Sequence, residues 1–143
     1  MRQEYGSAGF SLAERLLHRN KMEASKLKRS VLIVDDETEI CILLAGIIRK
    51  KNVQADYVHS IADAKDTIRQ WEPQLLFLDI NLPDGNGIEF LAELNKKHPK
   101  MKVVVISAFD LLREKAYANG AFRFLPKPFS GKAVVDILER SEI

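Results

Sequence analysis

The sequence has few of the residues that covalent cross-links need. A single cysteine, Cys41, among 143 residues excludes an internal disulfide. Cys41 stands in an apolar helical stretch, with no histidine or second cysteine near it in the sequence. We therefore expect a buried thiol that packs in the core, rather than a redox, metal-binding or nucleophilic group.

The sequence also lacks long apolar runs. No run approaches the roughly 18 residues that a membrane-spanning helix needs, and the N-terminus lacks the apolar core of a signal peptide. We therefore expect a cytoplasmic protein. No internal repeat or low-complexity segment is present, and a composition of 46% hydrophobic and 29% charged residues is typical of one globular domain of this length.

The sequence has little excess of either charge except at the N-terminus. Residues 1–29 hold seven Lys and Arg against three Asp and Glu, a net charge of +4, whereas the remaining residues hold 15 against 17, a net charge of −2. We therefore divide the chain into a basic N-terminal arm, residues 1–29, and a globular domain, residues 30–143. The basic residues of the arm are too few and too scattered to indicate nucleic-acid binding.

The arm has the pattern of a short amphipathic helix. The run Ser11-Leu12-Ala13-Glu14 fits a capping box, and Phe10, Ala13, Leu16 and Leu17 fall on one helical face. Two interpretations stay open. The arm is either a locally helical segment that frays or packs on the domain, or a segment for docking, dimerisation or contact with a membrane surface.

From residue 30 onward, apolar strand-like runs alternate with amphipathic stretches. The predicted strands are 31–34, 53–58, 74–78, 102–106 and 121–125. The predicted helices are 38–50, the stretch between Ser60 and Pro73, 87–97, 111–119 and 131–140. This alternation is typical of βαβ units around a parallel sheet.

Carboxylates follow two of these strands directly. Asp35 and Asp36 come after the run 30–34, and Asp79 comes after the run 75–78 and before a loop rich in Gly and Pro. Parallel strands present their carboxyl ends to a ligand crevice, so we expect the three acids to lie together. Three such carboxylates resist ionisation unless a cation compensates them, and Mg²⁺ prefers oxygen ligands and pairs with phosphoryl groups.

The motifs at successive strand ends identify a family. They are Val-Leu-Ile-Val-Asp-Asp-Glu at 31–37, Leu-Leu-Phe-Leu-Asp-Ile-Asn-Leu-Pro-Asp-Gly-Asn-Gly at 75–87, Val-Val-Val-Ile-Ser-Ala at 103–108 and Gly-Ala-Phe-Arg-Phe-Leu-Pro-Lys-Pro-Phe at 120–129. With these motifs, residues 30 to about 141 resemble the receiver domain of bacterial two-component response regulators. The resemblance implies an α/β, flavodoxin-like fold, a doubly wound parallel sheet of five strands in the order 2-1-3-4-5 flanked by five helices.

The resemblance also implies roles for individual residues. Asp79 would accept the phosphoryl group, while Asp35, Asp36, Asp79 and the backbone carbonyl of Asn81 would hold Mg²⁺. Lys127 would serve as a point charge toward the phosphoryl group, and the family usually has a cis peptide bond between this lysine and the following proline, here Pro128.

The resemblance further implies a switch. The hydroxyl of Ser107 would donate to a phosphoryl oxygen, and its inward movement would free space for Phe124 to turn from an outward to an inward position. Plain core packing of Phe124 in both states is the alternative.

Family members place two residues beside the path of the water that hydrolyses the aspartyl phosphate. These positions are Asn81 and Phe109 here, and a bulky apolar group at 109 would slow hydrolysis. The segment from Ser107 to Gly120 is also shorter than is usual for the family.

Two other functional classes fit less well. A Mg²⁺-dependent phosphohydrolase with an aspartyl nucleophile needs a second acid two residues after the nucleophile, and Asn81 stands there. A receiver that has lost phosphorylation is disfavoured because Asp35, Asp36, Asp79, Ser107 and Lys127 are all present. We therefore expect a signalling domain and not a turnover enzyme.

The expected partners are proteins. A sensor histidine kinase or a histidine phosphotransfer protein would supply the phosphoryl group, and a downstream protein would bind the phosphorylated form. Up to residue 143, the sequence shows no pattern of an effector domain. The chain is therefore interpreted as a stand-alone receiver, a phosphorelay intermediate, or a receiver cut from a larger regulator or hybrid kinase.

Overall fold

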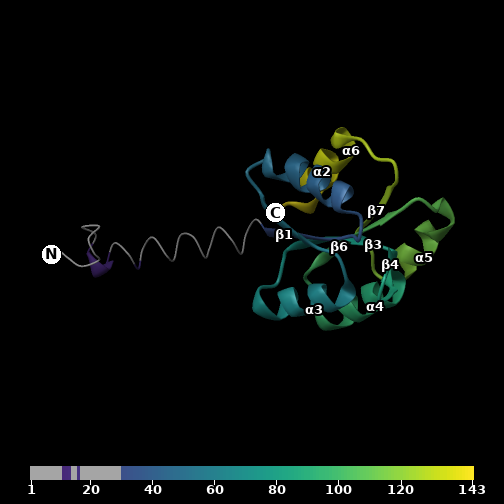
Figure 1. Ribbon diagram of the computed structural model, residues 1–143, viewed down its shortest axis with the longest axis horizontal. Coiled ribbons are helices and arrows are strands. Elements are labelled where there is room, and N and C mark those ends of the chain that lie inside the picture. Colours follow the sequence, from purple (N-terminus) through teal and green to yellow (C-terminus); the bar gives the residue numbers. More distant parts are fainter. Residues whose placement is uncertain (1–10, 14–15, 17–29) are drawn as a thin grey trace.

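Strands and helices alternate from Ser30 onward in the computed structural model, which describes residues 11–13, 16 and 30–143 (Figure 1). The main sheet contains β1 (Ser30–Val34), β2 (Gln54–Val58), β3 (Leu75–Asp79), β6 (Lys102–Ser107) and β7 (Arg123–Pro126). The helices are α2 (Thr38–Arg49), α3 (Ile61–Gln70), α4 (Gly87–Lys97), α5 (Arg113–Ala118) and α6 (Gly131–Ser141). The ten predicted elements are present, with ends that differ by one or two residues.

The sheet has the predicted topology. All its neighbouring strands are parallel, and their order is β2-β1-β3-β6-β7, which in chain order is 2-1-3-4-5. In the register of the sheet, Asp79 lies beside Ile106 and Ser107 lies beside Pro126. The carboxyl ends of β1, β3, β6 and β7 therefore meet at one edge.

Two helical layers enclose the sheet. In Figure 1, α2 and α6 cover one face, and α3, α4 and α5 lie on the other. Every residue of β1 and β3 is buried, and successive residues of these strands belong to two different core clusters, such as Val31 on one face and Leu32 on the other. A strand that is covered on both faces reads as a continuous apolar run, which explains why the sequence revealed these two strands so clearly.

Local signals set several helix ends as predicted. Ser60 caps α3, because its Oγ accepts a hydrogen bond from the N–H of Asp63 at 3.1 Å. Asn52 has a φ of 60° after α2, and Gly120 has a φ of 100° after α5. Both residues adopt the left-handed conformation that ends helices, which glycine tolerates best and asparagine next.

The structure adds two details that the sequence did not reveal. The loop after β3 contains a small hairpin, β4 (Asn81–Leu82) and β5 (Gly85–Asn86), whose strands are too short to show a periodicity. The helix predicted over 111–119 begins instead as a 3-10 turn, η1 (Asp110–Leu112), and continues as the six-residue α5. Spacings of three and four residues overlap at the start of a helix, so the sequence pattern did not separate the two.

Most of the predicted helix in the N-terminal arm falls outside the described residues. Residues 12, 13 and 16 are helical and exposed. Among all helices in the part of the chain that the structure describes, none combines the length and apolar character needed to cross a membrane.

Candidate functional site

Three carboxylates gather at the carboxyl edge of the sheet, as the sequence predicted. Asp35 and Asp36 directly follow β1, and Asp79 is the last residue of β3. Their oxygen atoms lie within 4.8 Å of one another. Asp35 and Asp79 are buried and Asp36 is exposed, so the cluster opens to solvent on the side of Asp36.

Burial makes it costly to charge this cluster. The pKa of Asp79 is raised to about 6, first by burial and then by the neighbouring carboxylate of Asp35, and Lys127 opposes both effects only in part. Burial likewise raises the pKa of Asp35. A cation at this position would remove the penalty, because it compensates charges that water no longer solvates.

Asp35 supplies the observation that favours a metal ion. Its Oδ1 accepts a hydrogen bond from the N–H of Glu37 at 2.8 Å. Its Oδ2 is buried, and its one close polar contact among the described residues is an ion pair with the ammonium of Lys127 at 3.1 Å. A buried carboxylate oxygen with a single cationic neighbour, beside two further carboxylates, fits a hard divalent cation such as Mg²⁺.

Lys127 follows β7 and reaches into the cluster. Its Nζ lies 2.8 Å from Glu37 Oε1, 3.1 Å from Asp35 Oδ2 and 3.5 Å from Asp79 Oδ1. Burial alone would lower the pKa of Lys127, but the contacts with Glu37, Asp35 and Asp79 raise it above its ordinary value. The ammonium therefore stays charged at neutral pH.

Glu37 is a member of this site that sequence reasoning did not assign. The signal was present as the third acid of the run Asp35-Asp36-Glu37. An acid at the start of a helix is common at the surface, however, because it interacts favourably with the helix dipole. Only the fold shows that the side chain of Glu37 turns toward Lys127.

Ser107 lies at the end of β6, next to the strand that leads to Lys127. Its side chain is buried, and its Oγ accepts a hydrogen bond from the N–H of Phe109 at 3.0 Å. Its carbonyl accepts from the N–H of Lys127 at 2.9 Å. The peptide bond between Lys127 and Pro128 is cis, as the resemblance implied.

Phe124 points into the core and not outward. Only 6% of its surface is exposed, and it belongs to the cluster on the α3, α4 and α5 face. The guanidinium of Arg113 lies 4.6 Å from its ring centroid, and the backbone N–H of Phe124 donates to the Tyr117 hydroxyl at 3.2 Å. The ring of Phe124 thus lies inward and against the guanidinium of Arg113 from α5.

The two residues assigned to the water path are both exposed. Phe109 has 57% of its surface exposed. Asn81 is exposed in β4 and pairs with Asn86.

Hydrogen bonds hold both ends of the loop after Asp79. The N–H of Gly87 donates to the carbonyl of Ile80 at 2.8 Å, and Asn86 caps α4 by accepting from the N–H groups of Ile88 and Glu89. In the middle of the loop, the carboxylate of Asp84 accepts from the first two N–H groups of α3, each at 2.9 Å. This cap joins residues more than 20 positions apart, so no local sequence pattern indicated it.

The expectation for Cys41 needs one correction. Cys41 is buried as predicted, and burial raises the pKa of its thiol to about 12. A histidine is nevertheless close in space, because His59 follows β2 and its Nδ1 lies 3.9 Å from Cys41 Sγ. Both side chains contact the backbone carbonyl of Asp35, at 2.9 Å for His59 Nδ1 and 3.2 Å for Cys41 Sγ. Cys41 and His59 thus pack against the backbone of Asp35, next to the acid cluster.

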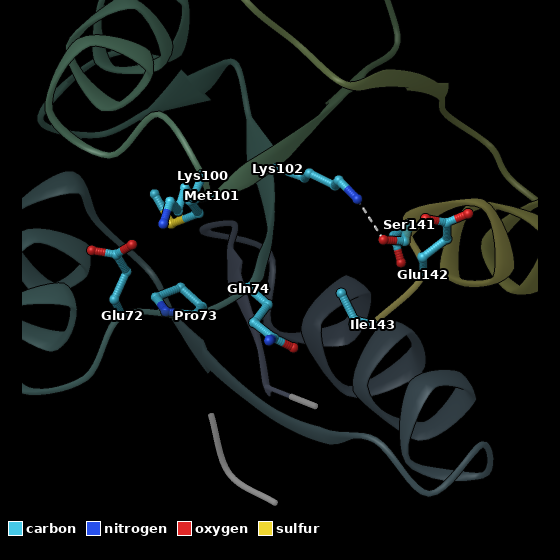
Figure 2. A pocket seen from close by; sticks show the side chains of 9 residues that line it. All are labelled: Glu72, Pro73, Gln74, Lys100, Met101, Lys102, Ser141, Glu142 and Ile143. Atoms are coloured by element: carbon cyan, nitrogen blue, oxygen red, sulfur yellow. Dashed lines mark hydrogen bonds between the residues drawn. The ribbon is translucent and has the colours of Figure 1, made fainter. Parts of the chain in front are cut away.

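A pocket of about 370 Å³ lies away from this cluster. As Figure 2 shows, its lining comes from the amino ends of β3 and β6 and from the end of α6, the opposite edge of the sheet. Lys102 Nζ donates to the carbonyl of Ser141 at 2.6 Å across this pocket. None of the lining residues belongs to the carboxylate cluster.

Comparison with known proteins agrees with this geometry. The family model for the response regulator receiver domain matches residues 31–139. The nitrogen assimilation regulatory protein NtrX of Azorhizobium caulinodans is 34% identical over 119 residues, which cover 80% of this chain and 26% of that protein. The DNA-binding transcriptional regulator NtrC of Proteus hauseri is 28% identical and is covered to 24%. The chain thus spans about a quarter of the length of these relatives.

The solved structures give the same result. The crystal structure of the receiver domain of NtrX from Brucella abortus has 33% sequence identity and a TM-score of 0.74, and the match covers 78% of this chain and 97% of that one. The residues that the family model matches, 31–139, include Asp35, Asp36, Asp79, Ser107 and Lys127. The chain belongs to the response regulator receiver domain family.

Proposed function

We propose that Asp79 accepts a phosphoryl group from a histidine kinase or a histidine phosphotransfer protein, and that the phosphorylated domain changes its binding to a protein partner. One observation carries the proposal. Asp79 is a buried carboxylate with a raised pKa, and it lies 3.5 Å from the ammonium of Lys127 and beside Asp35 and Asp36. An oxygen nucleophile with cationic partners is what phosphoryl transfer requires.

Each residue has a role in this transfer. An oxygen of Asp79 attacks phosphorus and forms the new O–P bond, while the bond between phosphorus and the donor atom breaks and its electron pair leaves with the donor. Lys127 pairs with the equatorial phosphoryl oxygens, and the Ser107 hydroxyl, whose Oγ accepts from the N–H of Phe109, can donate a hydrogen bond to one of them. Mg²⁺ held by Asp35, Asp36, Asp79 and the Asn81 carbonyl would neutralise charge on these oxygens.

The same groups support a two-state output. A phosphoryl group stabilises one conformation only by its differential contacts, and about 5.5 kcal/mol takes a population from 1:99 to 99:1. Contacts of the phosphoryl group with Ser107 and Lys127 supply part of this free-energy difference. The buried position of Phe124 corresponds in this proposal to the inward state, which the contact of its ring with Arg113 stabilises.

A small phosphodonor tests the assignment of Asp79. Acetyl phosphate is expected to add one phosphoryl group to the wild type only when Mg²⁺ is present, as measured by intact-protein mass. Asp79→Asn should show no modification, because the amide is not a nucleophile. Equal modification of the variant, or modification that does not depend on Mg²⁺, would refute the site.

The lifetime of the aspartyl phosphate tests the role of residue 109. Phe109 offers no hydrogen bond to a water behind the phosphorus, whereas a carboxylate at this position could orient one. Phe109→Glu is expected to shorten the half-life on the order of tenfold, which corresponds to about 1.4 kcal/mol of barrier. A time course of phosphoprotein decay at saturating Mg²⁺ measures it, and identical decay would remove Phe109 from the mechanism.

The proposed partners are proteins. Residues 30–143 carry a net charge of −2, which disfavours direct contact with nucleic acid. The DNA binding named for the NtrC relatives belongs to proteins that this chain matches over only about a quarter of their length. We further propose that the chain is a signalling domain that acts in the cytoplasm, and not a turnover enzyme.

Deletion of residues 1–29 tests the proposed boundary between arm and domain. Every site residue lies after residue 29, so the truncated chain is expected to fold and to accept the phosphoryl group as the full chain does, while its partner choice or oligomeric state changes. Circular dichroism and the acetyl phosphate reaction measure this. A truncated chain that does not fold would place the arm in the core.

A further inference from the structure

Glu37 makes the shortest contact of Lys127. The distance from Lys127 Nζ to Glu37 Oε1 is 2.8 Å, compared with 3.5 Å to the acceptor Asp79. The two carboxylates differ in burial, since 61% of the Glu37 side chain is exposed but only 8% of the Asp79 side chain. The lysine is therefore shared between an acid at the rim of the site and the acids inside it.

The backbone fixes Glu37 in this position. Its N–H donates to Asp35 Oδ1 at 2.8 Å, and it is the residue immediately before α2. No side-chain hydrogen bond to the helix occupies its carboxylate. The residue thus contacts a proposed metal ligand through its backbone and the proposed phosphoryl-binding lysine through its side chain.

We infer that Glu37 is a positioning residue that holds Lys127 toward the rim and competes with the phosphoryl group for it. This inference rests on the proposed function. When a phosphoryl group arrives on Asp79, Lys127 has to give up part of its contact with Glu37 to pair with the new oxygens. The lost pair is a cost of the active state, so removal of the Glu37 charge favours that state.

The size of this cost follows from the exposure of the pair. Ion pairs with one exposed member contribute roughly 0.2 to 1 kcal/mol. Loss of the pair is therefore expected to tighten the binding of a phosphoryl analogue up to about fivefold. Because salt screens exposed pairs, the difference between wild type and variant should shrink as ionic strength rises.

Glu37→Gln is the test variant, since it keeps the length and the oxygen of the side chain but removes the charge. Glu39→Gln is its matched control, because Glu39 is an exposed acid in the first turn of the same helix and has no ion pair among the described residues. Beryllofluoride, a phosphoryl analogue, is titrated at saturating Mg²⁺ into the full chain. Glu37→Gln should bind it about 1.4- to fivefold more tightly than the wild type, and Glu39→Gln should not differ from the wild type.

A second measurement reports on the pair without any phosphoryl chemistry. The side-chain ¹⁵N and ¹H signals of Lys127, assigned with Lys127→Met, should shift in Glu37→Gln and stay in place in Glu39→Gln. Unchanged Lys127 signals in Glu37→Gln, or equal beryllofluoride affinities of Glu37→Gln and wild type, overturn the inference. A wild type that binds no beryllofluoride and accepts no phosphoryl group contradicts the proposed function instead.

Discussion

Replacing Gly87 by alanine is expected to destabilise the domain by roughly 3 kcal/mol and to reduce phosphorylation of Asp79. A Cβ at this position would lie 2.5 Å from the carbonyl oxygen of Asp79 and 2.7 Å from the Cα of Ile80. Both atoms belong to the backbone, so no side chain can rotate to relieve the overlap. The end of β3, which carries the acceptor, has to move.

The sign of this effect is opposite to what helix propensity predicts. Gly87 is the first residue of α4, and alanine is the better helix former by about 1 kcal/mol. Gly46 in α2 is the matched control, because a Cβ there meets no atom of the described residues within 4 Å. Gly46→Ala is therefore expected to stabilise the protein by roughly 0.5 to 1 kcal/mol.

Urea unfolding of the two variants beside the wild type measures both effects, and acetyl phosphate measures the reactivity of Asp79. We expect Gly87→Ala to lose stability and reactivity with acetyl phosphate, and Gly46→Ala to gain stability. If Gly87→Ala also gains stability, the close approach of α4 to the end of β3 does not exist in solution.

Replacing Asp79 by asparagine is expected to stabilise the metal-free protein at pH 7.5 by up to about 3 kcal/mol. Burial and the Asp35 carboxylate raise the pKa of Asp79 from 3.8 to about 6. Ionising Asp79 in the folded protein therefore costs free energy that ionising it in the unfolded chain does not. An asparagine of nearly the same shape carries no charge and avoids this cost.

The gain in stability of Asp79→Asn over the wild type should increase as pH rises. Between pH 4 and 6 the folded state holds a proton on Asp79 that the unfolded state has released, so the stability of the wild type falls as pH rises through this window. The advantage of Asp79→Asn should therefore be small at pH 4.5, grow up to about pH 6, and stay constant above it.

Chemical unfolding in the presence of a chelator, at pH 4.5 and at pH 7.5, measures the difference. Mg²⁺ provides the internal control. It should stabilise the wild type at pH 7.5 and stabilise Asp79→Asn much less, because the variant has lost one of the charged ligands. An advantage of equal size at both pH values would mean that the charge of Asp79 costs nothing in the folded protein.

The sequence by itself determined the fold and most of the site. The strands β1 and β3 are covered on both faces, so the runs that end in Asp35 and Asp79 had to be continuously apolar and were easy to recognise. Parallel strands bring their carboxyl ends to one edge, and the resemblance to receiver domains implied the strand order that makes the residues after these strands neighbours. This is why Asp35, Asp36, Asp79, Ser107 and Lys127 could be placed together.

The tertiary structure decided which side chains contact one another across large sequence separations. Glu37 reaches Lys127 from 90 positions away, Asp84 caps α3, and His59 lies beside Cys41. Each of these residue types is common at surfaces and turns, and each contact depends on side-chain directions that the periodicity of the sequence does not encode. The same holds for Phe124, which is apolar enough for either orientation and whose ring packs inward in the core, against Arg113.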